Sequence, residues 1–383
     1  MTTLAGGHIS GTDRPVVIRT RAGLIGSVDD LPGYQDDEAT DVTIDVTGLT
    51  VAPGLIDLQI NGAYGSDFTS DPETIWKVGA RLPEQGVTAF LPTIITSSLD
   101  TIAGARAALS GRPPGYRGAE PLGFHLEGPM LSPKKPGVHD PALMRLPSLD
   151  LIEGWSARSG VAMVTMAPEL PGSRPVIEAL TKSGVVVSAG HTAATLEEAS
   201  AGFGWGISAV THLFNAMEPF DHRAPGLIGA VVRDFQAIAG IIADGVHCDP
   251  AAVLAAWRWL GPSRLALVTD AISAVGLGDG DYELGRIQVV VRDGQASTSS
   301  GRLAGSTLTM DQAVRNLVNF TGCSEAEALA TASAVPAKVL GLRDRGSLAV
   351  GARADLVVLD ESMEVVATMV GGDVAHLRED WET

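Results

Sequence analysis

The chain has 383 residues, of which 45% are hydrophobic, so it can bury the core of one large domain and a smaller one. Its formal net charge of −18 argues against a nucleic-acid partner, because such binding needs clustered Lys and Arg. No apolar run approaches the roughly 20 residues of a membrane helix. Two cysteines give no disulfide framework, and the N-terminus has no secretion signal. We therefore expect a cytoplasmic protein that binds neither nucleic acid nor membrane.

Short strands separated by turns open the chain, at residues 16–21, 24–28 and 42–45. Two more β-rich stretches, 348–360 and 364–370, lie near its end. These two terminal β-rich pieces indicate one small β-sandwich domain built from both ends of the chain, residues 1–52 and 345–383.

Short apolar runs that end in small or polar residues recur between these flanks. They cover residues 55–60, 87–91, 122–126, 162–166, 185–187, 207–211, 237–242 and 265–269. Helix-like segments, such as 72–85, 195–202 and 250–260, separate most of them. Fully apolar strands alternating with helices indicate a parallel sheet covered on both faces, and eight units over roughly 250 residues suit a (β/α)₈ barrel.

We therefore predict an α/β fold with a (β/α)₈ TIM-like barrel at residues 53–344. A doubly wound open sheet is the main alternative, because the number of strands is hard to count from sequence. A β-hairpin insertion is expected near residues 282–299, where Arg292, Asp293, Gly294 and Gln295 suit a turn. Helices at 308–320 and 325–340 should follow it.

Polar side chains follow several of the predicted strands, at the end where such barrels carry their catalytic groups. These side chains are Glu127, His191, His212, Asp244, His247 and Asp270. One histidine at a strand end is usually structural, but several of the 8 histidines fall at this same end. A carboxylate and two imidazoles form a sound set for a divalent metal with an open position for water, so Glu127, His191 and His212 are the predicted ligands.

Asp270 and His139 are the candidate catalytic groups. A metal lowers the pKa of bound water toward ~7, and a nearby carboxylate can take its proton. We assign that role to Asp270, although a helix N-cap is the competing interpretation. His139 lies in a loop rich in Gly and Pro after Glu127, from which its imidazole could polarise a substrate carbonyl.

An anion site is predicted beyond the sixth strand. Backbone N–H groups near Ala216, the amide of Asn215, Arg223 and His247 could together hold an anion in this acidic chain. Taken alone, Arg223 is more typical of a solvated loop arginine than of a ligand contact, and the pair Lys134-Lys135 is more typical of solvated side chains than of a ligand clamp.

Taken together, these motifs resemble the N-acetylglucosamine-6-phosphate deacetylase family of the amidohydrolase superfamily. The matching segments occur in family order, at residues 53–57, 91–96, 125–129, 134–139, 167–169, 188–192, 211–217, 242–247, 267–271 and 305–310. No single segment is specific, but the combination is.

The resemblance implies hydrolysis of N-acetyl-D-glucosamine 6-phosphate to D-glucosamine 6-phosphate and acetate, through metal-bound water activated by Asp270. This reaction would serve amino-sugar catabolism and cell-wall precursor recycling. The resemblance also implies the metal ligands named above, with His139 polarising the acetamide carbonyl. The sugar phosphate would be contacted by Asn215, Ala216 and His247, and by Arg223 from the neighbouring subunit of a homodimer.

Gln59 and Asn61 occupy the positions where many members of the superfamily carry a His-x-His pair. Neutral amides are weak ligands for a transition metal, so we expect one divalent metal per subunit. Zinc or iron is expected, while manganese and cobalt also suit the ligand set. Gln59 and Asn61 are predicted to hydrogen-bond the active-site water or the substrate.

Three other functions remain open at this stage. A cyclic amidase or nucleobase deaminase of the same superfamily would normally carry the missing histidine pair. N-acetylgalactosamine 6-phosphate is an alternative substrate that no residue excludes. A non-catalytic phosphosugar-binding protein would be expected to lack a base, but Asp270 is present.

Overall fold

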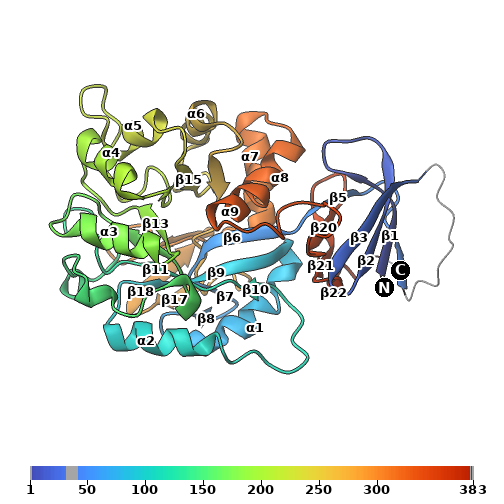
Figure 1. Ribbon diagram of the computed structural model, residues 1–383, viewed down its shortest axis with the longest axis horizontal. Helices are drawn as coiled ribbons and strands as arrows, with labels where there is room; N and C mark the ends of the chain where they lie inside the picture. Colours follow the sequence, from blue (N-terminus) through green and yellow to red (C-terminus); the bar gives the residue numbers. More distant parts are fainter. Residues whose placement is uncertain (1, 32–41, 380, 382–383) are drawn as a thin grey trace.

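The computed structural model in Figure 1 describes residues 2–31, 42–379 and 381. Its main body is a nearly closed barrel of eight parallel strands, which confirms the predicted fold class. In barrel order the strands are β6 (Leu55–Ile60), β9 (Val87–Ile95), β11 (Phe124–Glu127), β12 (Val161–Met166), β13 (Val186–Ala189), β14 (Ala209–Val210), β15 (Ile238–Ile241) and β16 (Leu265–Leu267). The strands are almost entirely buried, because helices cover their outer faces.

The barrel closes between β6 and the residues that follow β16. Ile60 and Ala271 form an isolated parallel bridge, and the backbone N–H of Asp270 donates to the carbonyl of Gln59 at 2.8 Å. Asp57 strengthens this seam from inside, since its carboxylate accepts the Thr269 hydroxyl at 2.5 Å and the Thr269 N–H at 3.3 Å. The seam therefore places the first strand beside the eighth.

Helices follow most of the strands and wrap the barrel. They are α1 (Ile75–Gly79), α2 (Leu99–Ala108), α3 (Ser173–Lys182), α4 (Leu196–Trp205), α5 (Gly226–Arg233), α6 (Pro250–Leu260), α7 (Met310–Thr321), α8 (Glu325–Thr331) and α9 (Ala334–Val339). Single 3₁₀ turns lie at η1 (Pro72–Thr74), η2 (Leu82–Gln85), η3 (Pro141–Leu143), η4 (Asp150–Ile152) and η5 (Ala157–Ser159).

Two long helices expected from the sequence are each interrupted. The segment 72–85 is η1, α1 and η2, and α1 ends at Gly79, four residues before Pro83. The segment 325–340 is α8 and α9, separated at Ala332, four residues before Pro336. A proline ring clashes with the carbonyl four residues earlier in a helix, which explains both breaks.

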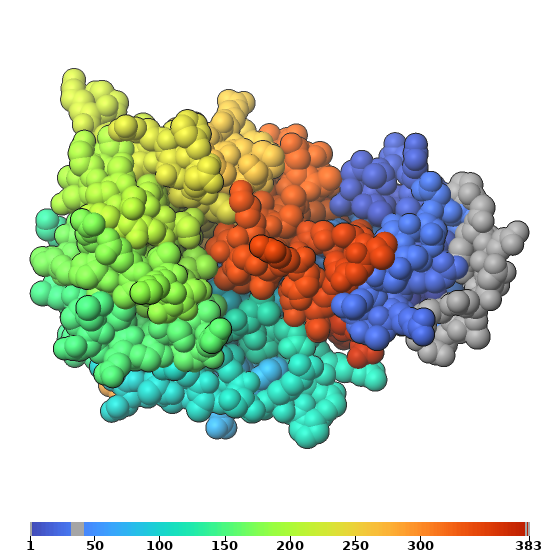
Figure 2. Space-filling model, viewed as in Figure 1, coloured from blue at the N-terminus to red at the C-terminus, as the bar shows by residue number. Residues whose placement is uncertain are grey.

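A separate eight-stranded sheet combines both ends of the chain, beside the barrel (Figure 1). Its strands are β1 (Thr2–Ile9), β2 (Pro15–Arg21), β3 (Leu24–Asp30), β4 (Val42–Asp45), β5 (Thr50–Pro53), β20 (Leu356–Leu359), β21 (Val365–Val370) and β22 (Asp373–Leu377). The sequence did not predict β1, β5 or β22. Ile18, Ile44 and Leu356 belong to a buried core distinct from that of the barrel. Figure 2 shows the N-terminal residues, in blue, gathered at one end of the molecule.

Smaller strands complete the fold. The insertion predicted as a hairpin is a three-stranded sheet of β17 (Gly280–Leu284), β18 (Ile287–Arg292) and β19 (Gln295–Ser297), with the expected turn between the last two. Short strands β7 (Gly62–Ala63) and β8 (Ser66–Asp67) pair with each other, and β10 (Glu120–Pro121) pairs with β9. Among the described residues, none of the helices has the length and apolar character to cross a membrane.

Candidate active site

Three strands bring the predicted metal ligands to the carboxyl end of the barrel. Glu127 is the last residue of β11, while His191 and His212 lie two residues past β13 and β14. Both histidines have positive φ values, 48° and 28°, and Asp270 shares this left-handed conformation at 49°. Such backbone conformations are costly for residues with a side chain and cluster at functional sites.

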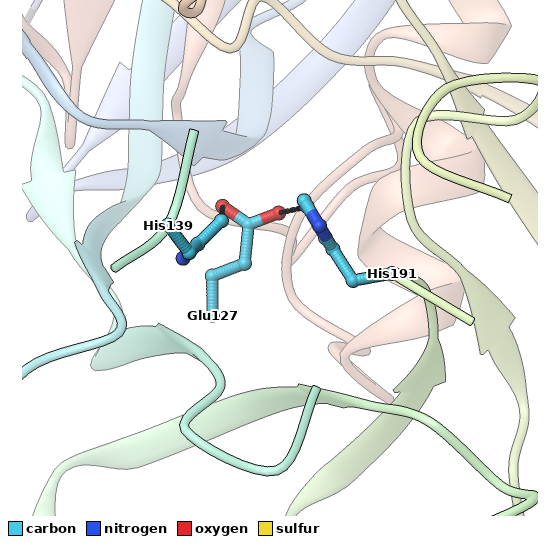
Figure 3. Close-up of side chains that lie close together, drawn as sticks. All are labelled: Glu127, His139 and His191. Carbon is cyan, nitrogen blue, oxygen red and sulfur yellow. Dashed lines mark hydrogen bonds and ion pairs between the residues drawn. The ribbon is translucent and has the colours of Figure 1, made fainter. Parts of the chain in front are cut away.

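One oxygen of Glu127 is the point on which the ligand atoms converge. Its Oε1 lies 3.1 Å from His191 Nε2 and 3.0 Å from His212 Nε2, and the two nitrogens are 3.2 Å apart. Figure 3 shows the Glu127 carboxylate directed between the rings of His139 and His191. All these side chains are nearly inaccessible to solvent.

The donor chemistry of this cluster fits a divalent cation. His191 Nδ1 lies 3.0 Å from the carbonyl oxygen of Lys135, which can only accept, so the ring proton is on Nδ1. His191 Nε2 therefore presents a lone pair to the Glu127 carboxylate and to His212 Nε2. Lone pairs facing one another at about 3 Å repel unless a proton or cation lies between them, and a carboxylate with two imidazoles is a common zinc ligand set.

The ionisable groups of the cluster change one another's pKa values. Burial works to raise the pKa of Glu127, but the imidazoles of His191 and His212 beside it hold that pKa well below its usual range. Burial likewise opposes protonation of His212, yet its hydrogen bond to Glu127 raises the pKa of the imidazole. The carboxylate thus remains ionised inside the barrel, as a metal ligand must be.

His139 lies at the same cluster but with a different tautomer. Its Nε2 is 3.8 Å from Glu127 Oε2, and its ring centroid is 4.4 Å from that of His191. The backbone N–H of Thr96 donates to His139 Nδ1 at 3.2 Å, which leaves the proton of the neutral ring on Nε2. Burial lowers the pKa of His139 to about 3.

The protonated Nε2 distinguishes His139 from the predicted metal ligands. Its ligand atom lies within 4.8 Å of those of Glu127 and His191, so distance alone would allow coordination. A protonated Nε2 has no lone pair for a metal, whereas it can donate a hydrogen bond. The geometry of His139 therefore suits a neutral imidazole whose Nε2–H group donates a hydrogen bond into the active site.

Asp270 is held by the amides of Gln59, in β6, and of Asn61, the residue directly after that strand. Asn61 Nδ2 donates to its Oδ1 at 2.8 Å, and Gln59 Nε2 donates to the same oxygen at 3.1 Å and to Glu127 Oε1 at 3.3 Å. Burial, followed by the charge of Glu127, raises the pKa of Asp270 to about 6. A carboxyl group with such a pKa can exchange a proton near neutral pH.

The residues predicted to hold the phosphosugar lie beside the ligands. His247 Nδ1 is bonded to Asp244 Oδ2 at 2.7 Å, so its Nε2 is the ring nitrogen left for a ligand, and its charge acts on Asp270. The Asn215 amide donates to the Leu213 carbonyl at 3.3 Å, and Ala216 follows in a left-handed conformation at φ 50°.

Arg223 is the exception among the predicted site residues. It lies in the exposed loop before α5, and its guanidinium makes no hydrogen bond or ion pair with any residue that the structure describes. A groove of about 1320 Å³ also lies off the site, between α2 and the β17–β18 turn, and no predicted site residue lines it.

Several supporting residues were not predicted from the sequence. Thr96 fixes the tautomer of His139, and the backbone carbonyl of Lys135 fixes that of His191. Glu169, after β12, accepts the Thr192 hydroxyl at 2.5 Å and the Ala193 N–H at 2.8 Å, next to His191. Thr96 and Glu169 lie in the motifs 91–96 and 167–169, but the sequence pattern gave no contact partner for either of them.

Comparison with known proteins matches residues 50–375 to the Amidohydrolase family. N-acetylglucosamine-6-phosphate deacetylase of Bos taurus is 42% identical over 357 residues, which are 89% of this chain and 87% of that protein. The Bacillus subtilis (strain 168) protein of the same name is 39% identical over 333 residues, 85% of this chain and 84% of its own. A mutant Mycobacterium smegmatis N-acetyl-D-glucosamine-6-phosphate deacetylase, solved in complex with N-acetyl-D-glucosamine-6-phosphate, superimposes with a TM-score of 0.88 at 33% identity, covering 98% of this chain and 99% of the other.

Proposed function

Because this chain belongs to the amidohydrolase family and, within it, to the N-acetylglucosamine-6-phosphate deacetylases, we propose that it hydrolyses N-acetyl-D-glucosamine 6-phosphate. The products are D-glucosamine 6-phosphate and acetate, which places the reaction in amino-sugar catabolism and cell-wall precursor recycling. The observation that carries the proposal is the convergence of Glu127, His191 and His212 on one point. Asp270 is joined to Glu127 through Gln59.

Glu127, His191 and His212 would hold one divalent cation per subunit. Zinc or iron is the expected ion, and manganese or cobalt also suits this ligand set. When bound, such an ion acts as a Lewis acid and lowers the pKa of water. The lone pair that His191 Nε2 directs at Glu127 supports this assignment.

Asp270 and His139 divide the proton chemistry. Asp270 takes a proton from the attacking water, whose oxygen forms a bond to the acetamide carbon. His139 Nε2–H donates to the carbonyl oxygen while negative charge develops there, and it stays neutral because of its low pKa. Asp270 then delivers its proton to the departing nitrogen as the C–N bond breaks, which releases the amine and acetate.

The phosphosugar would be held by Asn215, Ala216 and His247, with Arg223 reaching over from the neighbouring subunit of a homodimer. Arg223 is exposed and its guanidinium has no partner among the described residues, which supports a contact with the substrate bound in the neighbouring subunit. Phe220 and Trp259, with ring centroids 5.4 Å apart, expose 47% and 38% of their surface close to this loop and offer an apolar contact. A cytoplasmic location suits the two free, buried cysteines, Cys248 and Cys323.

Metal analysis combined with an acetate-release assay tests the proposal. Wild-type protein should contain near one metal ion per chain and release acetate from N-acetyl-D-glucosamine 6-phosphate. Asp270→Asn should lower kcat by about 10²–10⁴-fold, because it removes the general base. The control is Asp279→Asn, at an exposed carboxylate that only caps the β18–β19 turn.

Full activity of Asp270→Asn would contradict the mechanism, and about two metal ions per chain would contradict the single-ion site. N-acetyl-D-galactosamine 6-phosphate belongs in the same assay, because faster turnover of that epimer would change the assigned substrate.

A further inference from the structure

Three alternate side chains, two in β6 and one directly after it, contact the residues that follow β16. Positions 57, 59 and 61 point to one side of the strand, as alternate residues must. Asp57 binds the hydroxyl and N–H of Thr269, and both amides bind Asp270. The whole face is thus directed at Thr269 and Asp270.

The two oxygens of Asp270 have different surroundings as a result. Oδ1 accepts from Asn61 at 2.8 Å and from Gln59 at 3.1 Å. No described residue donates to Oδ2. A carboxylate only accepts, so both amides must present their NH₂ groups to Oδ1, and the orientation of each amide is determined.

We propose that Gln59 and Asn61 are positioning residues that hold Asp270 through Oδ1, so that Oδ2 is the oxygen that exchanges the proton with water and amine. This inference rests on the proposed function. It differs from the prediction that the two amides hydrogen-bond the active-site water or the substrate, because Gln59 Nε2 donates to two carboxylates and Asn61 Nδ2 donates to one.

The backbone makes this hold rigid. Asp270 has a left-handed conformation, and its N–H is bonded to the carbonyl of Gln59 at 2.8 Å. The N–H of Asn61 donates to the carbonyl of Ala271 at 2.8 Å, and Asp57 Oδ1 accepts the N–H of Gln59 at 3.1 Å. The main-chain hydrogen bonds around β6 therefore fix the backbone of Asp270. The remaining freedom is rotation of the Asp270 carboxylate, which the amides of Gln59 and Asn61 restrict.

Asn61→Leu and Gln59→Met remove the donors and keep the approximate shape. Each should lower kcat on the order of 10- to 100-fold, the loss expected for a hydrogen bond to a charged group, while KM changes less than about threefold. Asn61 contacts no predicted metal ligand, so the metal content of Asn61→Leu should match wild type. Gln312→Met, at an exposed amide on α7, is the control and should leave kcat, KM and metal content unchanged.

A crystal structure of Asn61→Leu supplies a readout that does not depend on turnover, and it should show the Asp270 carboxylate rotated away from its wild-type position. Should Asn61→Leu fail to fold, Asn61→Ser tests the same loss with a smaller side chain. A KM increase of tenfold or more at unchanged kcat would assign the amides to substrate binding and overturn the inference, as would loss of metal from Asn61→Leu. If wild type released no acetate, the proposed function would fail, and the position of Asp270 in the crystal would still decide this inference.

Discussion

Asp57 carries a buried carboxylate with no cation beside it. Burial raises its pKa to about 7, even though the Thr269 hydroxyl and two N–H groups donate to it. The carboxyl group is therefore protonated in the folded chain at a pH where the unfolded chain has already lost the proton. Its contribution to stability is complete below pH 3.8 and is lost as the pH rises through about 7.

Asp57→Asn should remove this pH dependence. Between pH 4 and pH 8, the unfolding free energy of wild type should fall relative to that of the variant, on the order of 4 kcal/mol. Urea denaturation of both metal-free proteins across this range measures the difference. A difference that stays constant with pH would mean that Asp57 titrates normally in the folded protein.

His139 separates hydrogen-bond donation from metal binding. Because its Nε2 carries the proton, His139→Ala should lower kcat by about 10²–10³-fold, the usual loss for one oxyanion donor, without reducing the metal content. Elemental analysis beside steady-state kinetics checks both parts. His376→Ala, in β22 of the terminal sheet, is the control. Loss of the metal from His139→Ala would instead identify His139 as a ligand.

At the scale of elements, the turn after β13 depends on a strand that carries no predicted ligand. Glu169, beyond β12, accepts from Thr192 and Ala193, and the N–H of Thr192 donates to the carbonyl of Ala216 at 3.1 Å. This chain of contacts joins the ends of β12, β13 and β14. It holds the left-handed His191 and the loop of Asn215 in one arrangement.

Glu169→Gln should therefore weaken metal binding, because Gln can replace only one of the two acceptor contacts without reorientation. A loss of about 10- to 100-fold in affinity is expected for an outer residue that orients a ligand. Competition with a chromogenic chelator measures it. The matched control is Glu178→Gln on α3, where the carboxylate pairs with the exposed Arg174 and with no other described residue. If Glu169→Gln and Glu178→Gln bound the metal with equal affinity, Glu169 would not be a residue that orients the ligand His191.

At the scale of the whole molecule, the remaining question is whether Arg223 acts between subunits. At substrate concentrations below KM, the Arg223→Ala and Asp270→Asn variants should each have low activity. In a mixed dimer, the subunit that retains Asp270 receives Arg223 from its partner. Random re-assortment of the two variants should thus restore about a quarter of wild-type activity. Activity of the mixture equal to the mean of the two variants would place Arg223 in its own subunit's site, or outside any site.

The order of strands and helices could be predicted from the sequence because it depends on local patterns. All eight barrel strands were predicted from apolar runs of strand length. Glu127, His191, His212 and Asp270 were predicted as site residues because they are polar and follow such runs. Strands β1, β5 and β22 were not predicted. β5 pairs with β1 and with β20, which lies near the other end of the chain, so no local pattern specifies it. β1 and β22 also pair with their sequence neighbours, β2 and β21. The domain boundaries at 52/53 and 344/345, and the catalytic roles, remain predictions.

The sequence by itself determined the fold class, the family resemblance and the set of polar groups at one end of the barrel, because strand ends and their side chains are specified locally. Only the tertiary structure decided which atom each group presents. The tautomers of His139 and His191 depend on Thr96 and Lys135, and the partners of Gln59 and Asn61 depend on where the barrel closes. Hydrogen bonds between residues far apart in the chain set these choices, and no local pattern contains them.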